Sequence, residues 1–152
     1  SIMSVELISE SIATDHGRVS SVKYTVIDSH TGAPNDIVCV TREAYDQLAA
    51  SAGRKTLKFD DFIKVLRPFM MGRLAADDIP DAFVILDSDR SGKIALKELA
   101  AFIPIIIPGG TEAMLMQHMK KIDGNYDEQL DSTEFTNFIM RGIGRDIVLQ
   151  RH

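Results

Sequence analysis

Residues 87–98 place oxygen-bearing groups at a spacing that can wrap a hard metal cation. Side-chain oxygens stand at the first, third and fifth positions, a backbone carbonyl at the seventh and a glutamate at the twelfth. The residues concerned are Asp87, Asp89, Ser91, Lys93 (through its carbonyl) and Glu98. Gly92 occupies the sixth position, where the chain must turn sharply and glycine tolerates a left-handed backbone. Because calcium prefers about six to eight oxygen ligands, the pattern predicts a calcium-binding loop.

A second segment of the same kind covers residues 123–134. Its predicted ligands occupy the same positions, with an additional carboxylate at the ninth: Asp123, Asn125, Asp127, Gln129 (through its carbonyl), Asp131 and Glu134. Glu128 stands at the sixth position, where the first loop has its glycine. A glutamate forced to positive φ costs about 1 kcal/mol or more. We therefore expect a working but altered site.

Helices are expected on both sides of each loop, because pairs of apolar residues three apart share one helix face. These pairs are Phe83 with Leu86, Leu99 with Phe102, Met119 with Ile122, and Phe135 with Phe138. One of these helices is predicted over 112–122, with Thr111 as its N-cap. Ile94 and Leu130 share the eighth position of their loops and are predicted to join the two loops by a short antiparallel bridge.

The front half of the chain is less regular. Residues 41–71 read as helix, loop, helix, and their loop at 50–61 lacks early carboxylates, so it is not expected to bind calcium. Apolar residues continue a regular spacing toward the N-terminus: Leu57 precedes Ile94 by 37 residues, and Val22 precedes Leu57 by 35. This spacing favours a further, vestigial repeat with a helix over 5–14. The alternative is a β-hairpin, because 21–28 and 36–41 alternate like strands around a turn-rich segment.

Residues 77–142 resemble the C-terminal lobe of the calmodulin, centrin and troponin C superfamily. The likeness is carried by residues 82–99 and 123–135 and is thin over the first half of the chain. It implies an all-α fold of EF-hand helix-loop-helix repeats, arranged as two EF-hand pairs with short loop–loop β-bridges. The family's metal ligands match the residues named above, except that Ala95 departs at the ninth position of the first loop and leaves water to supply that ligand.

Three domains are expected on this basis. A degenerate EF-hand-like lobe covers 1–71, within which 1–40 could instead be a β-hairpin extension. The C-terminal EF-hand pair covers 77–142, and a tail covers 143–152.

The resemblance also implies a function. In this family, calcium opens the helix pair and exposes a methionine-rich groove that accepts an amphipathic partner helix. Met114, Met116 and Met140 are the candidate contacts; core packing is the alternative, and it is favoured for Met119. We expect a calcium sensor that binds up to two Ca²⁺ and then a partner helix. A calcium buffer, or a light-chain-like adaptor that binds its helix independently of calcium, remains the alternative.

Charge and composition narrow the remaining function classes. Residues 77–152 carry thirteen acidic and eight basic side chains, a net of −5, whereas 1–76 carry nine of each. This asymmetry argues against nucleic acid and suits cations or basic partner helices. No apolar run is long enough to span a membrane, and the single Cys39 cannot form an internal disulfide. These two features lead us to expect a cytoplasmic protein. The sequence offers no recognisable nucleophile with a nearby base, so we expect that it is not an enzyme.

Overall fold

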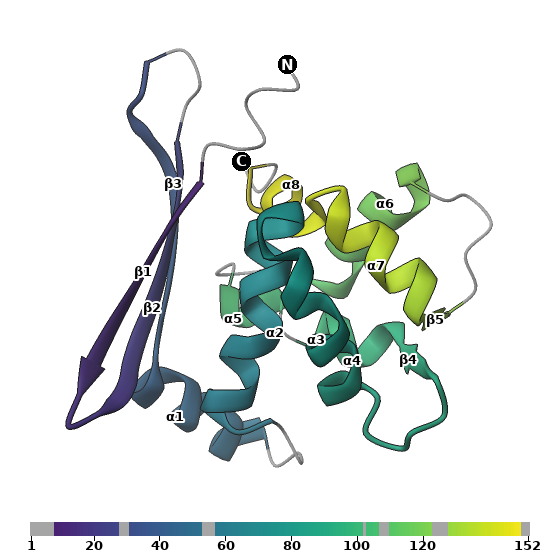
Figure 1. The fold of residues 1–152 in the computed structure, drawn as a ribbon, viewed down its shortest axis with the longest axis horizontal. Helices are drawn as coiled ribbons and strands as arrows, with labels where there is room; N and C mark the ends of the chain where they lie inside the picture. The colour runs from purple at the N-terminus through teal and green to yellow at the C-terminus, as the bar shows by residue number, and fades with distance from the viewer. Residues whose placement is uncertain are drawn as a thin grey trace. The chain divides into compact units, whose positions relative to one another are not determined.

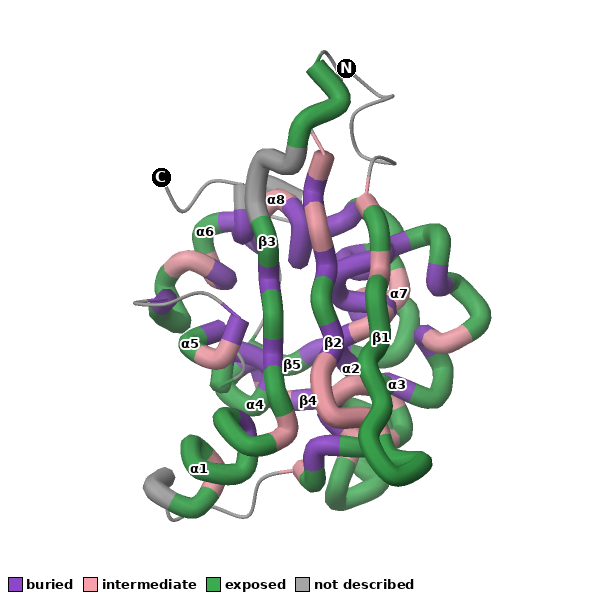
Figure 2. The backbone as a smooth tube through the Cα atoms, turned by 90° about the vertical axis from the view of Figure 1, so that its left-hand side faces the viewer, coloured by how far each residue is buried: buried purple, intermediate pink, exposed green. Residues whose placement is uncertain are grey.

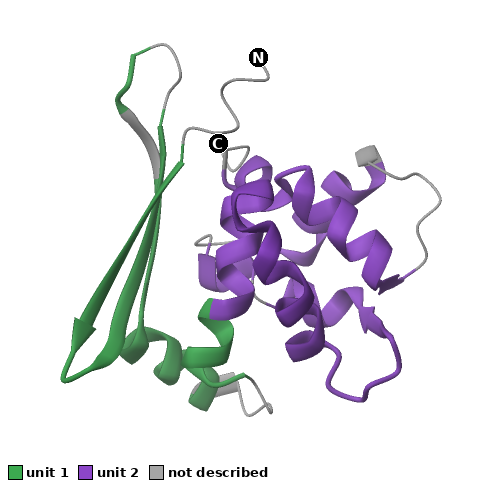
Figure 3. Cartoon of the chain, viewed as in Figure 1, with its two compact units in different colours: residues 1–63 green, residues 64–152 purple. Residues whose placement is uncertain are grey.

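Two hydrophobic patterns divide the chain. Apolar residues alternate with polar ones between residues 19 and 41, which suits strands, and recur every three or four residues later, which suits helices. The computed structural model follows both patterns in two compact units, Ser1–Ile63 and Lys64–His152, whose boundary lies within helix α2 (Phe59–Met71) (Figure 3). It describes residues 8–27, 31–52, 57–101, 103–106, 110–122 and 128–149 (Figure 1).

The first unit contains an antiparallel sheet of three strands, β1 (Ile8–Asp15), β2 (Arg18–Ile27) and β3 (Pro34–Thr41), in that order. Tyr24 of β2 lies opposite Glu10 of β1 and Val38 of β3. Alternate residues of β2 and β3 are buried, and this alternation can be followed along both strands in Figure 2. They are Val22, Tyr24, Val26, Val38 and Val40.

This sheet shows that the all-α prediction, with two EF-hand pairs, is wrong: the chain is a mixed α/β protein. The vestigial repeat and its helix over 5–14 are replaced from Ile8 onward by β1 and β2. The repeat spacing depended on single apolar residues, whereas the β-branched residues of β2 and β3 recur with a period of two. The β-hairpin alternative agrees with the pairing of β2 and β3.

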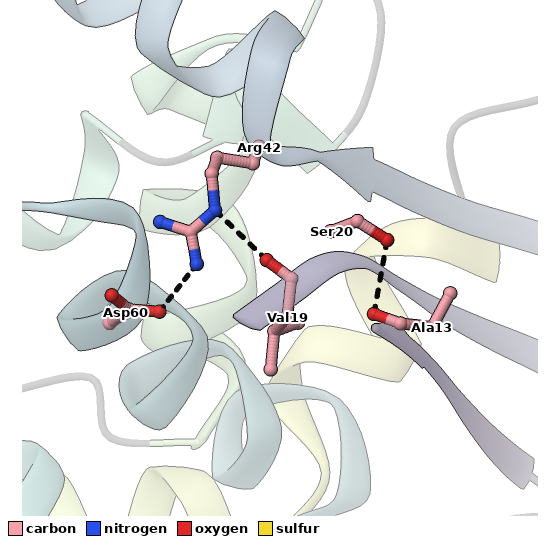
Figure 4. Close-up of polar contacts among 5 residues, drawn as sticks. All are labelled: Ala13, Val19, Ser20, Arg42 and Asp60. Carbon is pink, nitrogen blue, oxygen red and sulfur yellow. Dashed lines mark hydrogen bonds and ion pairs between the residues drawn. The ribbon is translucent and has the colours of Figure 1, made fainter. Parts of the chain in front are cut away.

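A tight turn joins β1 to β2. His16 and Gly17 both have positive φ, 53° and 78°, as a two-residue hairpin turn requires. The strand register shifts between Ala13 and Thr14, and the Ser20 hydroxyl donates a hydrogen bond of 3.2 Å to the Ala13 carbonyl beside that irregularity (Figure 4).

Helix α1 (Arg42–Ala52) follows β3 directly. Thr41 caps it, because its hydroxyl accepts a hydrogen bond of 3.1 Å from the Ala44 amide. The ring of Tyr45 stacks on Phe62 of α2, with the ring centroids 4.6 Å apart. The Tyr45 hydroxyl donates to the Leu57 carbonyl at 2.5 Å. The predicted helices within 41–71 therefore form.

Arg42 connects the sheet to α2. Its Nε donates to the Val19 carbonyl at 2.9 Å and its Nη2 to Asp60 at 2.7 Å (Figure 4). The guanidinium carbon lies 4.9 Å from the centre of the Phe59 ring. One planar side chain thus satisfies a strand carbonyl, a carboxylate and an aromatic face.

The second unit is mainly helical and is built around a two-stranded bridge. Its elements beyond α2 are η2 (Gly72–Asp78), α3 (Ile79–Leu86), β4 (Lys93–Ala95), α4 (Leu96–Ala100), α5 (Ile103–Ile106), α6 (Glu112–Ile122), β5 (Gln129–Asp131), α7 (Ser132–Met140) and α8 (Ile143–Leu149). β4 and β5 pair antiparallel with Ile94 opposite Leu130, and both side chains are fully buried. The predicted bridge is confirmed. Phe83 of α3 and Phe135 of α7 meet with ring centroids 5.8 Å apart.

Helix α8 packs against α6 and α7, and Ile147 and Val148 are fully buried. Arg145 of this helix is only 3% exposed. A Cβ atom added to Gly72 would stand 3.1 Å from the Arg145 Nη2, and one added to Gly142 would stand 2.3 Å from it. Both glycines have positive φ. Because these glycines follow the C-terminal ends of α2 and α7, the guanidinium lies where helix dipoles favour a cation.

Candidate metal centre

The first predicted loop begins where α3 ends. Asp87 is the C-terminal cap residue of α3, and its amide donates to the Phe83 carbonyl at 2.9 Å. Its side chain accepts hydrogen bonds from the Ser91 amide at 3.0 Å and the Gly92 amide at 2.9 Å. Asp89 accepts from the same Ser91 amide at 3.1 Å. These bonds turn both carboxylates toward the residues that follow them in the loop.

Ser91 and Lys93 complete this cluster of oxygens. The Ser91 hydroxyl lies 3.3 Å from an Asp87 carboxylate oxygen and 3.1 Å from the Lys93 carbonyl oxygen. Gly92 has the expected left-handed backbone, with φ of 83°, and Arg90 shares it at 56°. The structure therefore brings together four of the five predicted ligands of this loop.

Glu98, the fifth ligand, is exposed on α4. In the described part of the chain, no three acidic, histidine or cysteine side chains are gathered closely enough to hold a metal ion. Glu98 is therefore not drawn together with Asp87 and Asp89. The loop has the hard oxygen donors that suit calcium, but its closing carboxylate stands apart.

Hydrogen bonding favours the charged form of the Asp89 carboxylate. The Ser91 hydroxyl, and then the Ser91 amide, lower the pKa of Asp89 below its usual value by stabilising the charged carboxylate. A carboxylate that is ionised at neutral pH needs no deprotonation before it can bind a cation.

Only part of the second predicted loop can be placed. Asp123, Asn125 and Asp127 lie outside the described residues. Gln129 and Asp131 lie in β5 and Glu134 in the first turn of α7. The strain expected at Glu128 stays a prediction, because its φ angle is defined partly by residue 127, which lies outside the described residues.

Asp131 and Glu134 form a reciprocal capping box at the start of α7. The Glu134 amide donates to Asp131 at 2.8 Å, and the Asp131 amide donates to Glu134 Oε1 at 3.1 Å. The corresponding residue at the start of α4 is Ala95, which has no side-chain cap. The two loops are linked directly, because the Leu96 amide donates to the Glu128 carbonyl at 2.9 Å.

The methionines proposed for partner binding do not form one group. Met119 is fully buried in the core, as favoured from the sequence. Met116 is half-buried and lines a cavity of about 250 Å³ beside the bridge. Met114 is also half-buried, and Met140, 38% exposed near the end of α7, is not among the residues that line this cavity.

A second hollow, of about 510 Å³, lies in the first unit, where the β1–β2 turn meets the start of α1. Its walls include acidic and basic side chains, among them Asp15, His16, Arg18 and Glu43. The sequence reasoning missed it because the turn and the helix become neighbours only through the sheet that was not predicted. The mixed charge of its walls favours no single class of ligand.

Similarity to known proteins is limited to part of the chain. Cell division control protein 31 of Saccharomyces cerevisiae is 31% identical to it over 85 residues, which are 56% of this chain and 53% of that protein. The chain therefore spans about half the length of this curated relative. No family model and no solved structure matches the chain. None of the described helices is long and apolar enough to cross a membrane.

Proposed function

We propose that this protein binds calcium through Asp87, Asp89, Ser91, the Lys93 carbonyl and Glu98. The observation that carries the proposal is the cluster of oxygens from the first four of these residues, turned together by hydrogen bonds within the loop. The similarity to cell division control protein 31 and the resemblance of residues 77–142 to the EF-hand superfamily support it. We also propose that the protein is not an enzyme and acts in the cytoplasm, on composition alone.

Glu98 explains how binding could act as a signal. When bound, the cation supplies two positive charges that its surrounding oxygens share. Glu98 is not gathered with Asp87 and Asp89, and it stands on α4, so we infer that its engagement by the cation draws the start of α4 toward the loop. The hydrogen bond from Leu96 to Glu128 then transmits this shift to the second loop. A shift of helices on metal binding is what distinguishes a sensor from a buffer.

An amphipathic helix with a basic face is the proposed partner. The cavity beside the bridge offers Met116 as an apolar contact and Glu112 and Glu128 as exposed carboxylates. Leu96 and Lys97 of α4 also line it, so a shift of α4 would alter its shape. Methionine can repack against varied apolar side chains.

Calorimetric calcium titration of the chelator-stripped full chain, with magnesium present, tests the proposal. We expect up to two sites, and we expect Glu98→Gln to remove the first. Asp81→Asn is the matched control, because Asp81 is an exposed carboxylate in the first turn of α3, outside both loops. Absence of binding to the unmodified protein would refute the proposal, and so would an equal loss in both variants.

A second measurement separates the sensor from its alternatives. A hydrophobic dye should bind more strongly with calcium than with chelator if the helices open. Unchanged dye binding with a raised melting temperature would make the protein a buffer. Equal capture of a basic amphipathic peptide in calcium and in chelator would make it a constitutive adaptor.

A further inference from the structure

The sheet of the first unit ends in an edge strand, β3, that carries a single charged residue, Asp36, near its beginning. Among the described residues it pairs only with β2, through an unbroken register from Asp36 to Thr41. The five residues from Ile37 to Thr41 carry no charge, and four of them are β-branched. Ile37 is 49% exposed, and Cys39, on the same face, is also exposed.

Such an edge normally needs protection. An edge strand presents unpaired N–H and C=O groups, and proteins protect these groups with lysine, proline, bulges or very short strands. The opposite edge, β1, has such features: Glu10 lies along it, and its register shifts between Ala13 and Thr14. On β3 the proline and the register shift lie at the beginning, at Pro34, and leave residues 36–41 regular.

We propose that a second copy of this chain pairs antiparallel with β3 along its free edge. An antiparallel edge is complementary to itself about a two-fold axis, because each free N–H of one copy meets a C=O of the other. The absence of charge from Ile37 to Thr41 means that pairing brings no like charges together. Two three-stranded sheets would become one sheet of six strands and cover the half-exposed Ile37 of both copies.

Sedimentation equilibrium of the full chain over the micromolar range tests this pairing. Reducing agent prevents a disulfide at Cys39, and chelator makes the result independent of calcium binding. We expect a monomer–dimer equilibrium. Ile37→Lys should raise the dimer dissociation constant by about 30-fold, since it exposes two half-covered isoleucine positions and adds charge at the edge.

The opposite edge supplies a matched control. Ile12 of β1 is 51% exposed, so Ile12→Lys makes the same change at nearly the same exposure and should leave the dimer intact. If circular dichroism shows that Ile37→Lys is unfolded, Cys39→Lys takes its place, with the same expected weakening. A protein that stays monomeric at all concentrations would overturn the proposal, as would equal weakening by the Ile12 and Ile37 variants.

Discussion

The start of α4 lacks a feature that the start of α7 has, and this difference can be measured. Both helices follow a strand of the bridge, but α7 begins with the Asp131–Glu134 capping box and α4 begins at Ala95 with no side-chain cap. Glu98 stands three residues after Ala95, where it could complete the same box. We therefore predict that Ala95→Asp stabilises the protein.

The expected gain is about 1 kcal/mol, within the range of about 0.5–2 kcal/mol that N-cap residues contribute relative to alanine. Ala95 is only half-buried, so the new carboxylate keeps contact with water and should lose little solvation. For a chain of 152 residues, 1 kcal/mol raises the melting temperature by about 2–4 °C. Asp131→Ala should lower it by a similar amount, because it removes the existing cap.

Thermal unfolding in chelator, followed by circular dichroism, measures this effect without calcium. Ala95→Asn is the matched control: it can cap the helix but adds no charge, so it should keep most of the gain in stability. Calcium affinity should rise more with Ala95→Asp, because position nine of the loop then holds a carboxylate. If Asp131→Ala lowers the melting temperature but neither Ala95 variant raises it, the reasoning about α4 is wrong.

Three further predictions concern packing and titration. Gly144→Ala would place a Cβ 2.0 Å from the Phe69 carbonyl oxygen and should lower the free energy of unfolding by about 2–3 kcal/mol or more. Gly17→Ala meets no atom within 4 Å and should lower it by only about 1–2 kcal/mol, because alanine is strained at positive φ. Urea unfolding compares the two variants. Burial raises the pKa of Tyr45 from 10.0 to about 12, so the unfolded chain releases this proton first and the free energy of unfolding should fall between pH 10 and 12. Denaturant unfolding below and within that range should show a smaller fall in Tyr45→Phe than in the unmodified protein. Arg42→Lys keeps the positive charge but loses the planar guanidinium, with its two hydrogen bonds and its contact with the Phe59 ring. It should lower the free energy of unfolding by about 1–2 kcal/mol in the same urea assay. No change would mean that the guanidinium geometry adds nothing to stability.

The gathering of Asp87, Asp89, Ser91 and the Lys93 carbonyl could be predicted because these residues follow one another along a short segment. Their convergence depends on local turns, such as the left-handed backbone at Gly92, that the residue types themselves favour. The bridge was predictable for a similar reason, since Ile94 and Leu130 occupy equal positions in two loops and each has an apolar side chain to bury.

The sheet of the first unit was harder to predict from the sequence than the loop and the bridge. Which strands pair depends on contacts between distant residues, and a periodic spacing of single apolar residues competed with the alternation along β2 and β3. Val22 illustrates the error: it fitted the repeat spacing, but its burial comes from alternation with Tyr24 and Val26. The period of two was the more reliable signal, because it involves every residue of a strand rather than one residue in about thirty-six.

The second loop shows how one motif can have two meanings. Asp131 and Glu134 are spaced as metal ligands, but an aspartate three residues before a glutamate is also a helix N-terminus signal, and the structure uses the pair in that way. Glu134 Oε1 is hydrogen-bonded to the Asp131 amide, whereas Glu98 stands apart from the carboxylates of its own loop.

These two glutamates therefore face different requirements on binding calcium. On the proposal above, Glu98 approaches Asp87 and Asp89, and it stands on α4, a helix of five residues without a side-chain cap. Glu134 is already fixed on a capped helix of nine residues and must share an oxygen that the Asp131 amide already contacts. Because the Leu96 amide donates a hydrogen bond to the Glu128 carbonyl, we expect a movement of α4 to affect the second loop as well. If the protein binds calcium as proposed, we expect a change at Glu98 to remove the first site and also to weaken binding at the second loop, so that the pair of loops responds together.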